Sequence, residues 1–222
     1  MLCAGIFFIL VQSVRVQSLD FLTRKILDVG QTPHQISFSA DGNKAYIAAA
    51  VSDRIAIVDV ALLQIVAQID VPNTPLGIIE LPSGELAASQ FRSDGLIRLT
   101  KEGGQTGEKL ITGAGPSLFS GPFQNNIYLV SAERANRLWV LNASTFQLIR
   151  DYPTGQRPFP SSTTPDGKKA FVPNYNDRTV TVIDLVKQRV LATVAVGERP
   201  SGGAVRTELF LSILQHTLWS TV

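Results

Sequence analysis

The sequence contains a single cysteine, Cys3, and only two histidines, His34 and His216. One cysteine forms neither an intrachain disulfide nor a cysteine-held metal site. The two histidines are far apart and lack a ligand-spaced neighbour, so the sequence predicts no histidine-held metal either. Metal binding by carboxylates from distant segments is the alternative. These residues therefore indicate no metal and no cofactor.

Charged residues are also scarce, at 17%, and the net charge is only +2. So small a balance gives no reason to expect binding to nucleic acid or to an anionic membrane surface. Hydrophobic residues make up 45% of the chain, which is enough to bury a substantial core. We therefore expect a folded domain with no nucleic-acid partner and no transmembrane segment.

An apolar run over residues 2–11 is too short to span a bilayer. It is typical of the central region of a signal peptide, and small and polar residues follow it as far as Ser18. No basic residue precedes the run, since the first one is Arg15. We predict a signal peptide over residues 1–18, with the alternative that this segment is a strand of the folded domain.

Prolines recur at spacings of 42, 41, 42 and 42 residues, and we call them anchor prolines: Pro33, Pro75, Pro116, Pro158 and Pro200. A glycine stands three residues before four of the five. Eight residues after three of them come turn dipeptides: Asp41-Gly42, Ser83-Gly84 and Asp166-Gly167. Such residues tolerate the positive φ that tight hairpin turns require. The chain is therefore built from repeats of about 42 residues.

A third landmark opens an alternating, β-branched run in each repeat, and its members are Asp53, Asp94, Asn136 and Asp177. Alternation of this kind is the signature of a strand. Each repeat therefore contains four short strands, which in the first repeat are expected at 35–39, 44–48, 54–59 and 64–70.

Repeats of four antiparallel strands predict an all-β fold, a β-propeller of four-stranded blades. A β-sandwich also has many short strands, but it gives no reason for one motif to recur at constant spacing. Helical repeats of similar length are excluded because turn signals occur every 8–12 residues. We expect four full blades and part of a fifth within residues 19–205.

The segments 171–176 (FVPNYN) and 178–184 (RTVTVID) resemble the YVTN-type β-propeller repeat. The first repeat resembles it too, at 33–36 and 39–47, and the resemblance covers roughly residues 26–205. It implies a seven-bladed propeller that is periplasmic, secreted or on the cell surface of bacteria or archaea. Wider relatives include lactonase-like propellers, the haem d1 domain of nitrite reductase and amine dehydrogenase subunits.

The chain departs from this pattern in length, because seven blades of this size need close to 300 residues. After Val205 the expected turn is missing, and residues 206–222 do not match the repeat. We interpret this tail as truncated or frame-shifted; the alternative is a degenerate fifth blade with strands at 208–213 and 216–222. An incomplete seven-bladed ring leaves open sheet edges, which favour self-association.

Loops that enter the first strand of a blade and loops between its second and third strands emerge on one rim of a propeller. In phase with the repeat, that rim carries seven arginines: Arg54, Arg92, Arg134, Arg137, Arg157, Arg178 and Arg199. Converging guanidinium groups suit a carboxylate or phosphate. The simpler interpretation is that each arginine is solvated or paired with a neighbouring aspartate.

His34 follows an anchor proline at the expected mouth of the central channel, where no other repeat has histidine. It could hold a haem or metal, act as a base, or only cap a loop. Glu80 and Glu85 flank a turn and Glu133 lies in a rim loop. These glutamates could coordinate Ca²⁺ or act in acid–base catalysis, but turn glutamates more often only keep a hairpin soluble.

Nucleophile-elbow, phosphate-loop, dinucleotide-binding and haem c motifs are all missing, so no catalytic residue is assigned. The first hypothesis is an exported, non-catalytic binding propeller that presents its loop rim to a protein, a polymer or a small anionic ligand. The alternatives are an enzyme or enzyme subunit of the lactonase-like or quinone- and haem-linked type, and a non-functional fragment of a longer propeller.

Overall fold

The computed structural model describes residues 26–107, 109–111, 113, 115–123, 125–206, 209–214 and 220–221. The predicted signal peptide at 1–18 lies outside these residues. Within them the chain forms strands, turns and irregular segments only, so no helix of the described part is long and apolar enough to cross a membrane.

The strands form five antiparallel sheets, one for each anchor proline. The first sheet contains β1 (Pro33–Phe38), β2 (Lys44–Ala49), β3 (Arg54–Asp59) and β4 (Gln64–Asp70). The second contains β5 (Ile78–Glu80), β6 (Leu86–Gln90), β7 (Gly95–Leu99) and β8 (Leu110–Ile111). The third contains β9 (Pro116–Phe123), β10 (Ile127–Ala132), β11 (Arg137–Asn142) and β12 (Leu148–Pro153).

The fourth sheet contains β13 (Ser162–Thr163), β14 (Lys169–Asn174), β15 (Thr179–Asp184) and β16 (Arg189–Ala195). The fifth has three strands, β17 (Pro200–Arg206), β18 (Leu209–Leu214) and β19 (Ser220–Thr221). β18 and β19 lie in the tail, near the two strands of the degenerate-blade interpretation.

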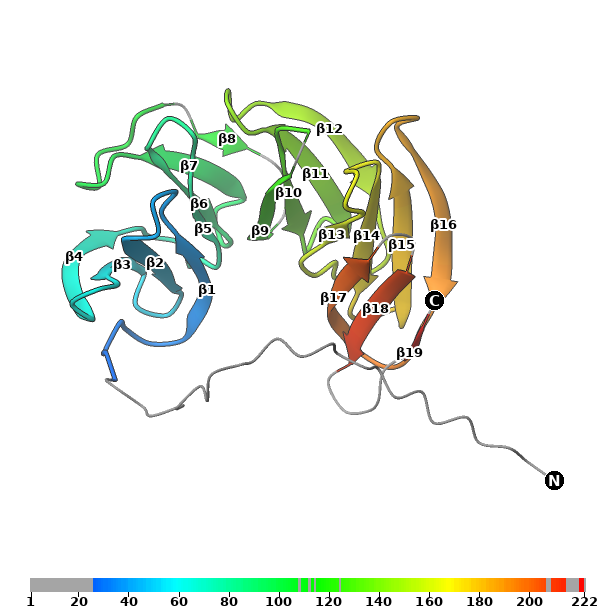
Figure 1. Ribbon diagram of the computed structural model, residues 1–222, viewed down its shortest axis with the longest axis horizontal. Helices are drawn as coiled ribbons and strands as arrows, with labels where there is room; N and C mark the ends of the chain where they lie inside the picture. Colours follow the sequence, from blue (N-terminus) through cyan, green and yellow to red (C-terminus); the bar gives the residue numbers. More distant parts are fainter. Residues whose placement is uncertain are drawn as a thin grey trace, which may run out of the picture.

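The sheets follow one another along an arc, with their first strands on the inner side (Figure 1). β1 contacts β5, β5 contacts β9, and β13 contacts β17, so neighbouring sheets meet along these first strands. β4, β12 and β16 lie on the outer side of the arc (Figure 1). This radial arrangement of four-stranded antiparallel sheets is that of a β-propeller, and it confirms the predicted fold class.

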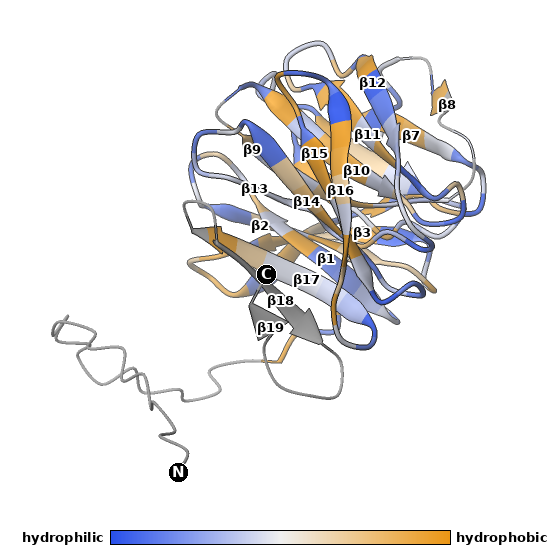
Figure 2. Cartoon of the chain, turned by 90° about the vertical axis from the view of Figure 1, so that its right-hand side faces the viewer, coloured by the Kyte–Doolittle hydropathy of each residue, from blue (hydrophilic) through white to orange (hydrophobic). Residues whose placement is uncertain are grey.

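The core lies between successive blades because the middle strands are apolar on both faces. In β2, Tyr46 and Ala48 face the second sheet and pack with Ile78 and Leu86. The intervening residues of β2 face the other way, where the segment before β1 covers them. Figure 2 shows the hydrophobic colour along the strands and the hydrophilic colour toward their ends.

Large aromatic side chains strengthen these interfaces. Trp139 is 2% exposed and Tyr128 1% exposed, and both pack between the second and third sheets. Full burial of one large apolar side chain stabilises a fold by about 1.5–3 kcal/mol. The burial of these two aromatics therefore stabilises the interface between the second and third blades.

Candidate functional site on the proline rim

We call one edge of the molecule the proline rim; it consists of the loops before the anchor prolines (30–32, 72–74, 113 and 115, 155–157, 197–199) and the turns between second and third strands (50–53, 91–94, 133–136, 175–178). Backbone hydrogen bonds join the two kinds of loop within a blade. The N–H of Ala50 donates to the carbonyl of Thr32 at 3.0 Å, and that of Tyr175 to the carbonyl of Arg157 at 3.0 Å. The two loop types therefore share one rim, as the phase of the repeat predicted.

A second set of hydrogen bonds joins each blade to the next. Asp53 Oδ1 accepts from the N–H of Thr74 at 2.7 Å, and Asp94 Oδ1 accepts from that of Gly115 at 3.0 Å. Asn136 Oδ1 accepts from the N–H of Arg157 at 2.9 Å. The acceptors have φ of 49°, 57° and 55°, a conformation that Asp and Asn adopt more readily than most residues. The landmark thus holds consecutive blades together.

In the fourth repeat the predicted landmark, Asp177, is one residue out of phase. Asp177 accepts from the N–H of Gln156 of its own blade, as the Ser52 hydroxyl does from Gln31 in the first blade. Arg178 occupies the landmark position, with φ of 57°, and its Nη2 pairs with Glu198 Oε1 at 3.0 Å. An ion pair therefore takes the place of the amide hydrogen bond here.

Among the seven predicted arginines, Arg134 and Arg157 line one shared hollow of about 290 Å³. The third blade contributes Glu133 and Asn136 beside Arg134, and its neighbours contribute the other lining residues: Phe91, Gln156, Arg157 and Asn176. The hollow therefore lies where the second, third and fourth blades meet on the proline rim.

Arg157 is held by rings on one side and by a carboxylate on the other. Its guanidinium lies 4.9 Å from the ring centre of Tyr175 and 5.5 Å from that of Phe159, and these two rings stack at 5.0 Å. Its Nε donates to Glu133 Oε2 at 3.1 Å, and the Glu133 side chain is only 10% exposed. The guanidinium is therefore fixed before any ligand arrives, while its Nη groups make no described hydrogen bond.

Arg134 is held in the same way by the second blade. Its Nη2 donates to the carbonyl of Phe91 at 2.7 Å and to Asp94 Oδ1 at 2.6 Å. The guanidinium also lies 4.9 Å from the centre of the Phe91 ring. Because the same Asp94 oxygen accepts from Gly115, this one carboxylate joins the blade contact to the hollow.

The other predicted site residues do not line this hollow. Arg137 Nε pairs with Asp151 of the neighbouring strand β12. Arg54 begins β3, and its buried Nε has no hydrogen-bond partner among the described residues. Arg92 and Arg199 are exposed on the rim, and His34 is exposed at the second position of β1.

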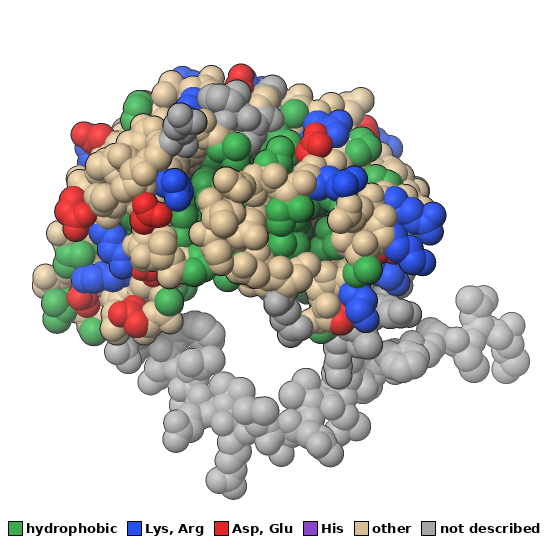
Figure 3. Space-filling model, turned by 90° about the horizontal axis from the view of Figure 1, so that it is seen from above, with side chains coloured by type: hydrophobic (Ala, Val, Ile, Leu, Met, Phe, Trp, Pro, Cys, Tyr) green, Lys and Arg blue, Asp and Glu red, His purple; other side chains and the backbone are tan. Residues whose placement is uncertain are grey.

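The three glutamates named as possible ligands do not lie together. Glu133 lies in the hollow, whereas Glu80 pairs with Lys101 and Glu85 with Arg98, at 2.5 Å and 3.7 Å. In the part of the chain that the structure describes, no group of three or more His, Cys, Asp or Glu residues could hold a metal ion. Figure 3 shows, on one side of the molecule, charged side chains of both signs around exposed apolar ones.

Sequence reasoning missed the aromatic and amide residues of this site. Tyr175 and Phe159 form the platform beneath Arg157, and exposed Gln156 and Asn176 add amide groups at its edge. One available signal was that Phe159 replaces the small or aliphatic residue that follows the other anchor prolines in repeats two, three and five.

Comparison with solved structures supports the fold. A candidate 6-phosphogluconolactonase from Bacteroides uniformis superposes with a TM-score of 0.68 at 13% identity, covering 84% of this chain and 64% of that one. Hydrazine synthase from Kuenenia stuttgartiensis gives 0.65 at 19%, covering 83% and 55%. A streptogramin B lyase gives 0.65 at 16%, covering 86% and 68%.

The chain thus spans between 55% and 68% of the length of these three structures. No family model matches the sequence, and a search of curated proteins found no match. At such low identities the likeness shows a propeller-like fold alone. Neighbours with enzyme names and a neighbour of unknown function, from Desulfotomaculum acetoxidans, share it equally. A YVTN-type propeller is consistent with the fold.

Proposed function

We propose that this chain is a non-catalytic binding propeller whose proline-rim hollow binds a small, polar carboxylate. The observation that carries the proposal is the convergence of Arg134 and Arg157, each held rigid by an aromatic ring and a carboxylate, on one hollow. Rigid guanidinium groups lose little conformational entropy when they bind a carboxylate.

The charge balance of the hollow favours a single anionic group on a polar molecule. Asp94 and Glu133 already pair with the two arginines, so the hollow carries no strong positive field. Each guanidinium nevertheless has five N–H donors, and the described contacts use Nη2 of Arg134 and Nε of Arg157. The remaining donors suit a carboxylate, and the Gln156 and Asn176 amides suit hydroxyl groups beside it.

Export to the periplasm, the medium or the cell surface also stays a proposal, which rests on the apolar run at residues 2–11. N-terminal sequencing of protein secreted by a bacterial host would test it, because removal of residues 1–18 is expected. Recovery of only the uncleaved chain would contradict it. Catalysis remains the alternative, although no residue of the rim has been assigned a catalytic role.

Calorimetric titration of the full chain with lactate, glucuronate and glucose tests the proposed binding. We expect lactate or glucuronate to bind and neutral glucose not to. Arg157→Gln should weaken the affinity for the carboxylate by about 10- to 100-fold, since a charge-assisted hydrogen bond contributes about 1.5–3 kcal/mol. Arg199→Gln is the matched control on the same rim and should change the affinity less than twofold.

Two results would count against the proposal. One is the absence of saturable binding by any carboxylate. The other is an equal loss of affinity in Arg157→Gln and Arg199→Gln, which would indicate general charge attraction rather than a site. Thermal melting of both variants shows that each is folded before the titration.

A further inference from the structure

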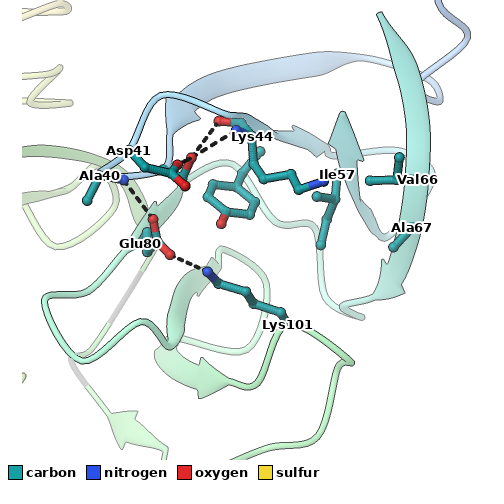
Figure 4. A pocket seen from close by; sticks show the side chains of 10 residues that line it. Ala40, Asp41, Lys44, Ile57, Val66, Ala67, Glu80 and Lys101 are labelled. Carbon is teal, nitrogen blue, oxygen red and sulfur yellow. Dashed lines mark hydrogen bonds and ion pairs between the residues drawn. The ribbon is translucent and has the colours of Figure 1, made fainter. Parts of the chain in front are cut away.

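The side chain of Gln35 joins two blades that are not neighbours. The landmark residues on the proline rim each reach only the next blade. On the opposite edge, Glu80 Oε2 accepts from the N–H of Ala40 at 2.9 Å, which again joins neighbours, the first and second blades (Figure 4). Gln35 lies in β1 of the first blade, but its hydrogen-bond partner lies in β9 of the third blade.

Both ends of the Gln35 amide are used in this contact. Nε2 donates to the carbonyl of Phe119 at 2.9 Å, and Oε1 accepts from the N–H of Phe119 at 3.1 Å. Phe119 is 4% exposed, and its strand β9 is the edge strand of the third sheet. Paired residues of antiparallel strands exchange the same two hydrogen bonds. The Gln35 amide therefore takes the place of a neighbouring strand at this point of the β9 edge.

The second blade leaves room for this contact at Gly77, which directly precedes β5 and is buried. An added Cβ at Gly77 would lie 2.9 Å from Gln35 Oε1 and 2.9 Å from the Phe119 ring, and it would overlap the carbonyl oxygen of Ser117. Glycine is typical of a place where another backbone approaches this closely. Any larger residue at position 77 would obstruct the path of the Gln35 side chain to the third blade.

The contact is specific to the first three blades. The residues two positions after the five anchor prolines are Gln35, Gly77, Leu118, Pro160 and Gly202. A glutamine followed by a glycine in the next repeat occurs once in this series. The repeat itself therefore does not require the contact.

The first blade has a use for such a restraint, because only one of its faces packs against another described blade. On its other face Ile36 is 58% exposed, whereas Ile78, at the same position of the second blade, is fully buried. A region with fewer buried contacts moves more easily. The two hydrogen bonds of Gln35 oppose such motion, because turning the first blade away from the third would break both.

We propose that Gln35 is a strap that ties the first blade to the third across the second and so fixes the curvature of the arc at this end. The inner strand of the second blade, β5 (Ile78–Glu80), has only three residues, and it lies between the two strands that the strap joins. The strap is a conformational device of the fold, and it does not depend on carboxylate binding at the proline rim.

Amide hydrogen exchange, followed by NMR on the ¹⁵N-labelled full chain, tests the hydrogen bonds of the strap. In Gln35→Ala the Phe119 N–H should exchange about 3- to 10-fold faster, as expected for the loss of one hydrogen bond. The Phe159 N–H, which donates to the carbonyl of Pro173 in the fourth blade, should keep its rate. The matched control is Gln64→Ala, an exposed glutamine on β4 of the first blade, which should change neither rate.

A distance measurement tests the effect of the strap on curvature. Ala61→Cys and Thr145→Cys place spin labels on exposed turns of the first and third blades, in a Cys3→Ser chain because Cys3 is the single native cysteine. Pulsed electron paramagnetic resonance should give a narrow distance distribution in the parent and in Gln64→Ala. Gln35→Ala should broaden the distribution, because the first blade is then free to turn.

Three results would overturn the proposal. An unchanged exchange rate at Phe119 in Gln35→Ala would show that burial alone protects this amide. Equal acceleration at Phe119 and Phe159 would indicate a general loss of stability instead of a local strap. An identical distance distribution in Gln35→Ala and the parent would show that the curvature is fixed without Gln35.

Discussion

The two rims of the propeller use polar side chains in different ways. On the proline rim, Asp53, Asp94 and Asn136 accept hydrogen bonds from the backbone of the next blade. The opposite rim, which we call the hairpin rim, consists of the turns that join first to second strands and third to fourth strands; there, Asp41 and Asp166 accept from residues of their own turns. A repeated polar residue therefore joins blades at one rim and only closes a hairpin at the other.

This difference indicates where substitutions are tolerated. A substitution at a proline-rim landmark disturbs two blades at once, whereas one in a hairpin turn stays local. Glu80 is the exception on the hairpin rim, since it accepts from Ala40 of the preceding blade, and it lines a second hollow, of about 460 Å³, between the first and second blades. On both rims, the hollow adjoins a polar contact between blades.

The largest expected effect is that of Asp94→Ala. This change removes the acceptor of the Gly115 N–H and the partner of Arg134, and it places alanine at a φ of 57°. We expect the free energy of unfolding to fall by about 2–3 kcal/mol in urea titrations, from the lost hydrogen bonds and the positive φ. Asp41→Ala should cost clearly less, and equal losses would remove the distinction between the rims.

Two glycine substitutions compare the rims at similar backbone conformation. Gly84, in a hairpin turn, has φ of 84° and an added Cβ would meet nothing within 4 Å. Gly115, on the proline rim, has φ of 73°, but an added Cβ would lie 3.0 Å from the Arg134 side chain. Gly84→Ala should cost about 1 kcal/mol from φ alone, and Gly115→Ala about 2 kcal/mol because crowding is added.

The Gly115→Ala substitution should also weaken carboxylate binding, because it pushes on Arg134, whereas Gly84→Ala should not. Urea titration measures the stability of each variant and calorimetry the affinity. If both variants lose the same stability and neither loses affinity, the contact between Asp94 and Gly115 does not influence binding in the hollow.

Asn136 offers a finer test, because its side chain contacts the next blade through Oδ1, which accepts from the N–H of Arg157. Asn136→Asp keeps an acceptor oxygen and tolerance of positive φ, so we expect a change in unfolding free energy within about 0.5 kcal/mol. Asn136→Ala should cost about 1–2 kcal/mol. A larger cost for Asp than for Ala would show that the amide, and not the oxygen, is needed.

The smallest effect concerns pH and the hairpin rim. The pKa of Asp41 and of Asp166 is lowered to about 2, mainly by hydrogen bonds from the Ser39 and Thr164 hydroxyls. A lowered pKa stabilises the folded chain above the unfolded value near 3.8, and this contribution is lost as the pH falls toward 2. Asp166→Asn, which has no charge to titrate, should therefore lose less melting temperature between pH 5 and pH 2.5 than the parent chain. Parallel losses would contradict this.

The architecture could be predicted from the sequence because the same turn and strand signals recur in each repeat. In the first blade, the expected strands at 44–48 and 64–70 agree with β2 at Lys44–Ala49 and β4 at Gln64–Asp70. The phase error at Asp177 arose because aspartate is chemically suited to either of two adjacent turn positions. Only the hydrogen bond from Gln156 and the φ of Arg178 show which position each occupies.

The site was less predictable. The phase of the repeat placed seven arginines on one rim, but the direction of each side chain depends on partners in other blades. Arg134 turns toward Phe91 of the preceding blade, and Arg137 turns outward to Asp151 of its own. The hollow on the hairpin rim was not expected, because the contacts of Glu80 with Lys101 and Ala40 leave no periodic signal in the sequence.

The most direct test of carboxylate binding on the proline rim is a crystal structure of the full chain with the carboxylate that binds most tightly in the calorimetric titration. We predict the carboxylate group in the proline-rim hollow, with its oxygens about 2.7–2.9 Å from nitrogen atoms of Arg134 and Arg157. Electron density for the ligand at another rim position, or contacts to neither arginine, would contradict it.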